Sequence, residues 1–107
     1  MPATSADHVE TDFTLAVLGG CDLRGVDLSD CRLSETSLVG ADLRKAVLRG
    51  ADLRGARTQD ARLDEADLRG ARVDPTLWTT AALRGARIDI EQALAFAAAH
   101  GLHVHGE

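Results

Sequence analysis

The stretch ADLRKAVLRGADLRGARTQDARLDEADLRG, residues 41–70, repeats a pattern of five residues. A large apolar residue takes the third place of each unit, except at Thr58, and a small residue takes the first place. Outward from this stretch, the same spacing continues without insertion from Thr11 to Ile90. A five-residue period fits neither an α-helix nor an alternating β-strand. The pattern therefore predicts a repeat architecture in which each unit packs against its neighbours.

Two inward-pointing residues in each unit indicate a coil of square cross-section, with one unit on each side. Twenty residues would then complete one turn, and residues twenty apart would stack at the spacing of paired strands. Thr58 and Trp78 are twenty apart and support this register, since a small residue against a large one keeps the packed volume constant. We expect an all-β solenoid of about four coils, with a buried ladder formed by Leu23, Leu43, Leu63 and Leu83.

The unit ADLRG, found at residues 51–55 and 66–70, resembles the signature of the pentapeptide-repeat family. This resemblance implies a right-handed quadrilateral β-helix. Over roughly residues 11–102 the likeness extends to the C-terminal half of MfpA-like proteins, the mycobacterial fluoroquinolone-resistance members of the family. The stretches that carry it are DFTLAVLGG (12–20), ETSLV (35–39), LRGADL (48–53), DPTLW (74–78) and QALAFAAAHGL (92–102). The resemblance implies a DNA mimic that binds and inhibits DNA gyrase and protects it from fluoroquinolones.

The residue before each large apolar residue should point outward, and it is often Asp. If the chain imitates DNA, the acidic residues expected to face gyrase are Asp22, Asp27, Asp42, Asp52 and Asp67. The charge count opposes this reading, because residues 11–90 hold thirteen acidic and twelve basic residues. Duplex DNA carries one negative charge per about 1.7 Å. The alternative is a short pentapeptide-repeat scaffold or protein-interaction module without gyrase activity, whose N-terminal edge is open for pairing.

Three regions follow from the pattern: a capping or disordered lead (1–10), the β-helix (11–90), and a C-terminal helix and tail (91–107). Asp89 and Gln92 form a capping box, and the run EQALAFAAAH is rich in helix formers. Gly101 is the expected stop. The sequence thus predicts one helix over residues 90–100.

That helix is apolar on two sides. One stripe consists of Ile90, Leu94 and Ala97, and the other consists of Ala93, Phe96 and His100. One stripe is needed to plug the last coil, which leaves the other for a second subunit. The resemblance also implies a two-fold dimer through this region. We expect a homodimer with Ala93, Phe96 and His100 at its interface, although a simple cap would also explain the helix.

Catalytic and metal-binding patterns are missing from the repeat. The histidines lie near the two ends of the chain, and no Ser/His/Asp or Cys/His arrangement is present. We therefore expect no enzyme activity, no cofactor and no metal.

Cys21 and Cys31 should lie on opposite sides of the coil, too far apart for a disulfide. No signal peptide, membrane span or nucleic-acid-binding pattern is evident, so we expect a cytoplasmic protein.

Overall fold

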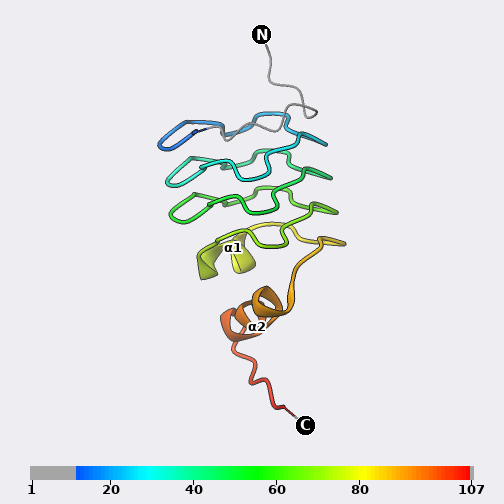
Figure 1. The fold of residues 1–107 in the computed structure, drawn as a ribbon. Helices are drawn as coiled ribbons and strands as arrows, with labels where there is room; N and C mark the ends of the chain where they lie inside the picture. Colours follow the sequence, from blue (N-terminus) through cyan, green and yellow to red (C-terminus); the bar gives the residue numbers. More distant parts are fainter. Residues whose placement is uncertain (1–11, 107) are drawn as a thin grey trace.

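The computed structural model describes residues 12–106, which wind as a four-sided coil around one axis (Figure 1). Isolated parallel bridges between residues twenty apart join successive coils, from Asp12↔Arg32 to Asp67↔Arg87. This spacing confirms the twenty-residue register expected from the sequence. It also defines four faces of the coil. The first face holds residues 12–15, 31–35, 51–55 and 71–75; the second holds 16–20, 36–40, 56–60 and 76–80; the third holds 21–25, 41–45, 61–65 and 81–85; the fourth holds 26–30, 46–50, 66–70 and 86–90.

The bridges stay isolated because the chain turns at every fifth residue. The corner residue takes a positive φ, such as 77° at Gly70 and 63° at Lys45. Glycine adopts this conformation readily, whereas a residue with a Cβ pays a steric cost. Each turn is closed by a hydrogen bond such as that from the Ala46 N–H to the Leu43 carbonyl, 3.0 Å long. A side of the coil is therefore too short for an extended strand to form.

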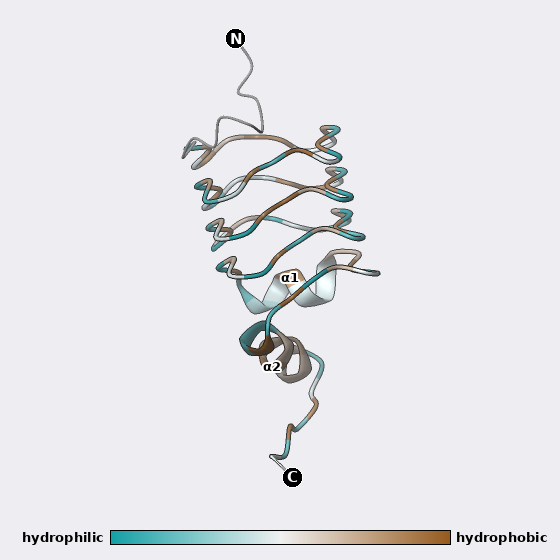
Figure 2. Cartoon of the chain, turned by 45° about the vertical axis from the view of Figure 1, so that its right-hand side comes forward, coloured by the Kyte–Doolittle hydropathy of each residue, from teal (hydrophilic) through white to brown (hydrophobic). Residues whose placement is uncertain are grey.

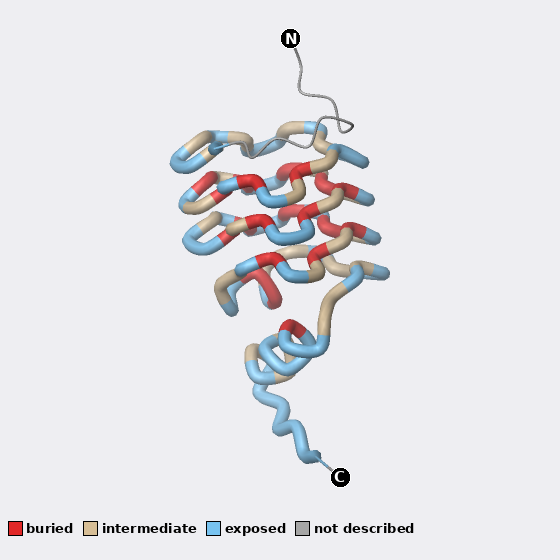
Figure 3. The backbone as a smooth tube through the Cα atoms, in the orientation of Figure 1, coloured by how far each residue is buried: buried red, intermediate tan, exposed pale blue. Residues whose placement is uncertain are grey.

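The inward-pointing residues form one continuous core along the axis. Leu43 and Leu63 are each only 1 % exposed, while Leu23 and Leu83 in the outer coils are partly buried against them. The coil register stacks these four leucines in one column on the third face, because Leu23, Leu43 and Leu63 each donate to a carbonyl of the following coil. Hydrophobic and hydrophilic residues alternate along each coil (Figure 2), and the buried residues concentrate in the middle coils (Figure 3).

A short helix that the five-residue pattern does not predict, α1 (Pro75–Thr80), replaces the last unit of the second face. Pro75 has no N–H to give to the ladder and suits the first turn of a helix. Trp78 is buried on α1 and is not a stacked coil residue. The Thr58 hydroxyl lies 2.9 Å from the hydroxyl of Thr80 on α1. The expected stacking of Thr58 with Trp78 as two coil residues was therefore wrong. The coil register resumes at Ala82.

The second helix, α2 (Ile90–Ala99), follows the last coil as expected. Asp89 and Gln92 form the predicted capping box, and Gly101 ends the helix region at a φ of 74°. The Gln92 side chain is buried, and its Nε2 donates to the carbonyls of Leu68 (2.5 Å) and Ala71 (3.0 Å). The amide group thus ties α2 to the coil above it.

Two aspartates end the corner ladder where the coil gives way to a helix. In regular coils, a corner N–H donates to the backbone carbonyl nineteen residues later, as from Gly25 to Arg44. At Gly55 and Gly70 the acceptor is instead a side-chain oxygen, of Asp74 and of Asp89 respectively. Just before α1 or α2, the side-chain carboxylate of Asp74 or Asp89 thus accepts the hydrogen bond that a backbone carbonyl accepts in a regular coil. The corner N–H groups of Gly55 and Gly70 therefore keep an acceptor where no regular coil follows.

Candidate functional site

The outer surface of the coil is dominated by pairs of Asp and Arg in the same repeat unit. Arg24 holds Asp22 with two hydrogen bonds, from Nε at 2.9 Å and from Nη2 at 2.8 Å. Three further units repeat this fork with distances of 2.6 to 2.9 Å: Asp42–Arg44, Asp52–Arg54 and Asp67–Arg69. Each Asp lies two places before its Arg at the start of a corner turn, and its Oδ1 also accepts the backbone N–H of that Arg at 3.1 to 3.2 Å. The arrangement neutralises each carboxylate locally.

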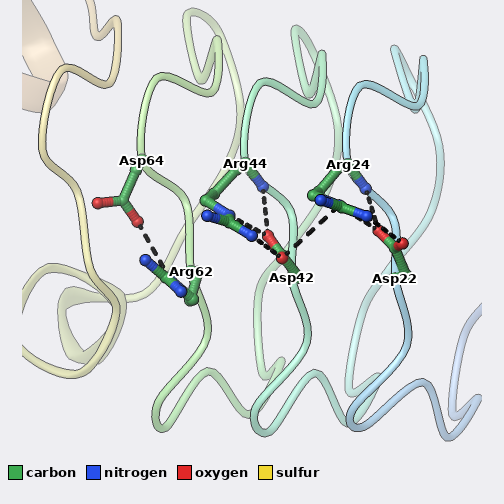
Figure 4. A network of polar contacts seen from close by, with 6 residues as sticks. All are labelled: Asp22, Arg24, Asp42, Arg44, Arg62 and Asp64. Atoms are coloured by element: carbon green, nitrogen blue, oxygen red, sulfur yellow. Dashed lines mark hydrogen bonds and ion pairs between the residues drawn. The ribbon is translucent and has the colours of Figure 1, made fainter.

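On the third face the pairs also reach between coils (Figure 4). The Nε atom of Arg24 lies 3.8 Å from an oxygen of Asp42 on the following coil. In the next coil the order of charges reverses, and Arg62 lies 3.9 Å from Asp64. Arg24 therefore contacts a carboxylate in its own unit and another on the following coil.

These contacts set the acidity of the carboxyl groups. The hydrogen bonds from Arg24 lower the pKa of Asp22 to about 2, and those from Arg54 and Arg69 lower the pKa values of Asp52 and Asp67 to about 2. A group whose pKa is lower in the folded state stabilises the fold above its unfolded pKa and loses that contribution as the pH falls through the folded value. The forks should therefore stabilise the fold at neutral pH and weaken between about pH 4 and pH 2.

The Arg54→Gln variant should return the pKa of Asp52 from about 2 toward its ordinary value of 3.8. The reason is that the side-chain hydrogen bonds from Arg54 are the largest cause of the lowering. NMR titration of the Asp side-chain carbons measures this shift, with Asp67 as the internal control because Arg69 still holds it. An unchanged Asp52 titration would show that the fork does not persist in solution.

The charges balance on every face of the coil. The second face carries Arg57 and Asp60 as its charged residues. The third face carries five basic and four acidic residues, and the first and fourth faces each carry three basic and four acidic residues. Each face is thus within one charge of neutrality, in contrast to the phosphate backbone of DNA.

The five acidic residues expected to face gyrase do lie on the outside, but they are not a row of unpaired carboxylates. Asp22, Asp42, Asp52 and Asp67 belong to the forks. Asp27 accepts from the N–H of Ser29 at 3.0 Å and from its hydroxyl at 2.6 Å. The spacing D-x-R was visible in the sequence and could have revealed the forks.

The C-terminal end of the coil carries an apolar concave surface. Edge-on packing of Phe96 against Trp78, with ring centroids 6.0 Å apart, covers one part of the last coil. Beside it remains a groove of about 450 Å³. The groove is lined by the apolar residues Trp78, Ala81, Leu83, Ala86, Ile88 and Phe96 and by the polar residues Arg84 and His100.

The residues expected at a dimer interface are divided between two roles. Phe96 packs on Trp78, and the Nε2 atom of His100 lies 3.1 Å from the Trp78 carbonyl. Both residues therefore make contacts within their own chain, and both also line the groove. Ala93 is exposed on α2. The exposed large side chains of α2 are Ile90 and Leu94 instead. The side of α2 that faces the coil therefore consists of Gln92, Phe96 and Ala99.

The described residues offer neither a metal cluster nor a membrane helix. Over residues 12–106, no group of three or more His, Cys, Asp or Glu side chains is placed to hold a metal ion. No helix in that range is long and apolar enough to cross a bilayer. Cys21 and Cys31 are both free thiols.

Comparison with solved structures finds similar repeat proteins in cyanobacteria. Alr5209, a pentapeptide repeat protein from Nostoc PCC 7120, is 40 % identical over 75 % of this chain and 66 % of its own, with a TM-score of 0.67. Rfr23, a pentapeptide repeat protein from Cyanothece 51142, is 30 % identical over 74 % of this chain and 50 % of its own, with a TM-score of 0.57. The chain thus spans less than two thirds of the length of either protein.

A third similar structure is QnrB1, a plasmid-mediated fluoroquinolone resistance protein. It is 25 % identical over 86 % of this chain and 47 % of its own. Its TM-score of 0.48 is too low for this likeness to bear on function. A comparison with curated proteins found no match.

The family comparison agrees with the five-residue register. A family model described as Pentapeptide repeats matches residues 4–34, 11–50 and 46–74. Together with the two cyanobacterial structures, this match implies the right-handed quadrilateral β-helix for the coil described above. The chain therefore belongs to the pentapeptide-repeat family.

Proposed function

We propose that the chain is a non-enzymatic protein-interaction module that pairs with a second copy of itself through its C-terminal end. The observation that carries this proposal is the apolar groove beside α2, which lies between Trp78, Leu83, Ile88 and Phe96. An apolar concave surface of this kind fits a protein side chain better than it fits a charged ligand.

The same end of the molecule also carries the side chains that could fill such a groove. Ile90 is 81 % exposed and Leu94 is 47 % exposed on the outer side of α2, and Leu102 and Val104 are exposed in the tail. Glu91 is the single charged residue of α2. A groove and an apolar ridge on one end make that end self-complementary, as a two-fold interface requires. This favours a second copy over an unrelated partner.

The Leu94→Glu variant should be monomeric at protein concentrations where the wild-type chain is a dimer. A carboxylate placed in an apolar interface loses its hydration without gaining a partner. Sedimentation velocity over a range of concentrations measures the change, and circular dichroism checks that the fold persists. Phe96 is a poor choice for this test, because it also packs on Trp78.

The matched control is Val39→Glu, which places the same charge at an exposed apolar site on the second face. That variant should remain dimeric. A wild-type chain that sediments as a monomer at every concentration would overturn the dimer proposal, as would a Leu94→Glu variant that dimerises normally.

Gyrase inhibition, which the family resemblance implies, has less support from the surface. The forks neutralise four of the five candidate carboxylates, and no face has the excess negative charge of a DNA mimic. A supercoiling assay with a large excess of the chain should therefore leave gyrase activity unchanged. Inhibition that disappears in the Asp22→Asn or Asp52→Asn variant would favour the DNA-mimic function instead.

A further inference from the structure

On the third face, the last coil ends in backbone groups that have no partner. In regular coils, the third and fifth residues of a unit donate their N–H groups to the next coil, and the carbonyl of the first residue accepts from it, as in residues 61–65. The same groups in residues 81–85 are the N–H groups of Leu83 and Gly85 and the Ala81 carbonyl. Within residues 12–106, none of these three groups has a partner. Neither α2 nor the tail satisfies this edge.

The open edge borders the apolar groove. Ala81 and Leu83 line the groove, and both are only partly buried. The Gln92 side chain holds α2 against the carbonyls of Leu68 and Ala71, which belong to the fourth and first faces. The edge of the third face is thus left open. An extended segment laid along it would pair with the backbone and would place alternate side chains in the groove.

The tail has the pattern of one repeat unit. Residues 102–106 read LHVHG, and this order of apolar, polar, apolar, polar and Gly is the order of ADLRG at residues 51–55. In the coil, the first and third places of a unit point inward and the fifth is the corner. The tail would have Leu102 and Val104 on the inward places and Gly106 at the corner. This unit starts one residue away from the five-residue frame of residues 11–90, so it does not continue the period.

The backbone of the tail also matches the edge. In a regular unit the first N–H closes the preceding turn, and the Leu102 N–H is likewise used locally, by the Ala97 carbonyl at 2.8 Å. In the coil register, the His103 N–H would donate to the Ala81 carbonyl. The carbonyls at the second and fourth places of the tail would accept from the two open N–H groups. All three unpaired groups of the edge would then have partners.

The tail does not occupy the groove of its own chain. Residues 102–106 are all exposed, with Leu102 at 61 % and Val104 at 59 %. The tail extends from α2 away from the coil, so that α2 lies between the two (Figures 1 and 2). In a two-fold pair, the tail of each copy can meet the open edge of the other. Two identical contacts would then form at once.

We propose that residues 102–106 of each copy add to the third-face edge of the second copy as one further repeat unit. Leu102 and Val104 fill the apolar groove of that copy, while His103 and His105 stay on the outside. This inference rests on the proposed self-association, and it names the segment and the backbone groups that form the interface.

Replacing both apolar residues of the tail tests the proposal in the full chain. The double variant Leu102→Ser with Val104→Ser should raise the dissociation constant of the dimer by about tenfold or more, because the groove loses two apolar side chains. Sedimentation velocity measures this change, and circular dichroism checks the fold. The matched control is His103→Ser with His105→Ser, which changes the outward places and should dimerise like the wild type.

A labelled peptide with the sequence of residues 101–106 tests the groove directly. Fluorescence anisotropy should show saturable binding to the double variant Leu102→Ser with Val104→Ser, and weaker binding to the wild type, whose groove is already filled. N-methylation of the peptide at His103 removes the donor to the Ala81 carbonyl and should weaken binding about tenfold. N-methylation at Val104 is the matched control, because a third-place N–H points away from this edge.

The outcomes separate this inference from the dimer itself. A double serine variant that dimerises like the wild type would overturn the inference and leave a dimer formed by α2. If that variant also binds the peptide, the tail belongs to the groove of its own chain. Equal binding of the two N-methylated peptides, or no binding of the unmodified one, would also overturn it. A wild-type chain that is always monomeric would overturn both proposals.

Discussion

Leu43→Ala is expected to lower the free energy of unfolding by about 2–5 kcal/mol. Leu43 is 1 % exposed in the middle of the core column, with Leu23 on the coil above and Leu63 on the coil below. Each coil is held by its neighbours, so the coil has little freedom to collapse around the lost side chain. Urea unfolding followed by circular dichroism measures the loss.

Leu23→Ala is the matched control, since it changes the same residue type in the same column. Leu23 is partly exposed at the edge, so less apolar surface is lost there and the expected effect is about 1–2 kcal/mol. Equal losses for the two variants would contradict the burial gradient along the column. A smaller loss for Leu43→Ala than for Leu23→Ala would contradict a core in which Leu43 is the more deeply buried residue.

Gln92→Leu should be the second severe change, with a loss of about 2–4 kcal/mol. Leucine keeps the apolar bulk but leaves the buried Ala71 carbonyl without the donor that Gln92 supplies. It also removes half of the capping box, because the Gln92 Oε1 atom accepts from the Asp89 N–H at 3.0 Å. The hydrogen bonds of the Gln92 amide are therefore expected to contribute more to stability than the volume of the side chain.

Glu91→Gln provides the comparison for Gln92→Leu. It changes an exposed side chain in the same turn of α2 and should alter the stability by less than about 0.5 kcal/mol. Both variants are measured by thermal and urea unfolding. A Gln92→Leu protein as stable as the wild type would show that α2 does not depend on this amide for its attachment.

The sequence predicted the coil because its period is strict and physically unusual. The spacing of Leu43, Leu48 and Leu53 fixes both the five-residue side and, through closure of the square, the twenty-residue turn. The capping box at Asp89 was visible for a similar reason, since its two partners are close in sequence. Local or repeated patterns of this kind can be recognised in a sequence without knowledge of tertiary contacts.

The helix α1 escaped detection because its sequence imitates the repeat. Thr76 and Trp78 fall on the small and large places of the pattern, although they belong to a helix. The competing signal was Pro75 after Asp74, which favours a helix start and cannot continue a ladder. At this point the backbone chemistry of one residue outweighed the periodicity of its neighbours.

The candidate surface was predicted only in part. The columns of Asp22 with Asp42 and of Asp27 with Asp67 follow from the register. The forks depend on side-chain conformations that periodicity does not specify. The sequence pattern also could not predict the orientation of α2, because either of its two apolar stripes could have packed against the coil. The contact of Gln92 with Leu68 and Ala71 fixes that orientation.

The carboxylates of Asp74 and Asp89 have a consequence for how such rods change length in evolution. Because each replaces a single carbonyl at a corner, the closure needs nothing from coils farther away. A duplication or deletion of one complete turn upstream would leave the same closure intact. The number of coils can therefore change by whole turns while the C-terminal closure stays the same.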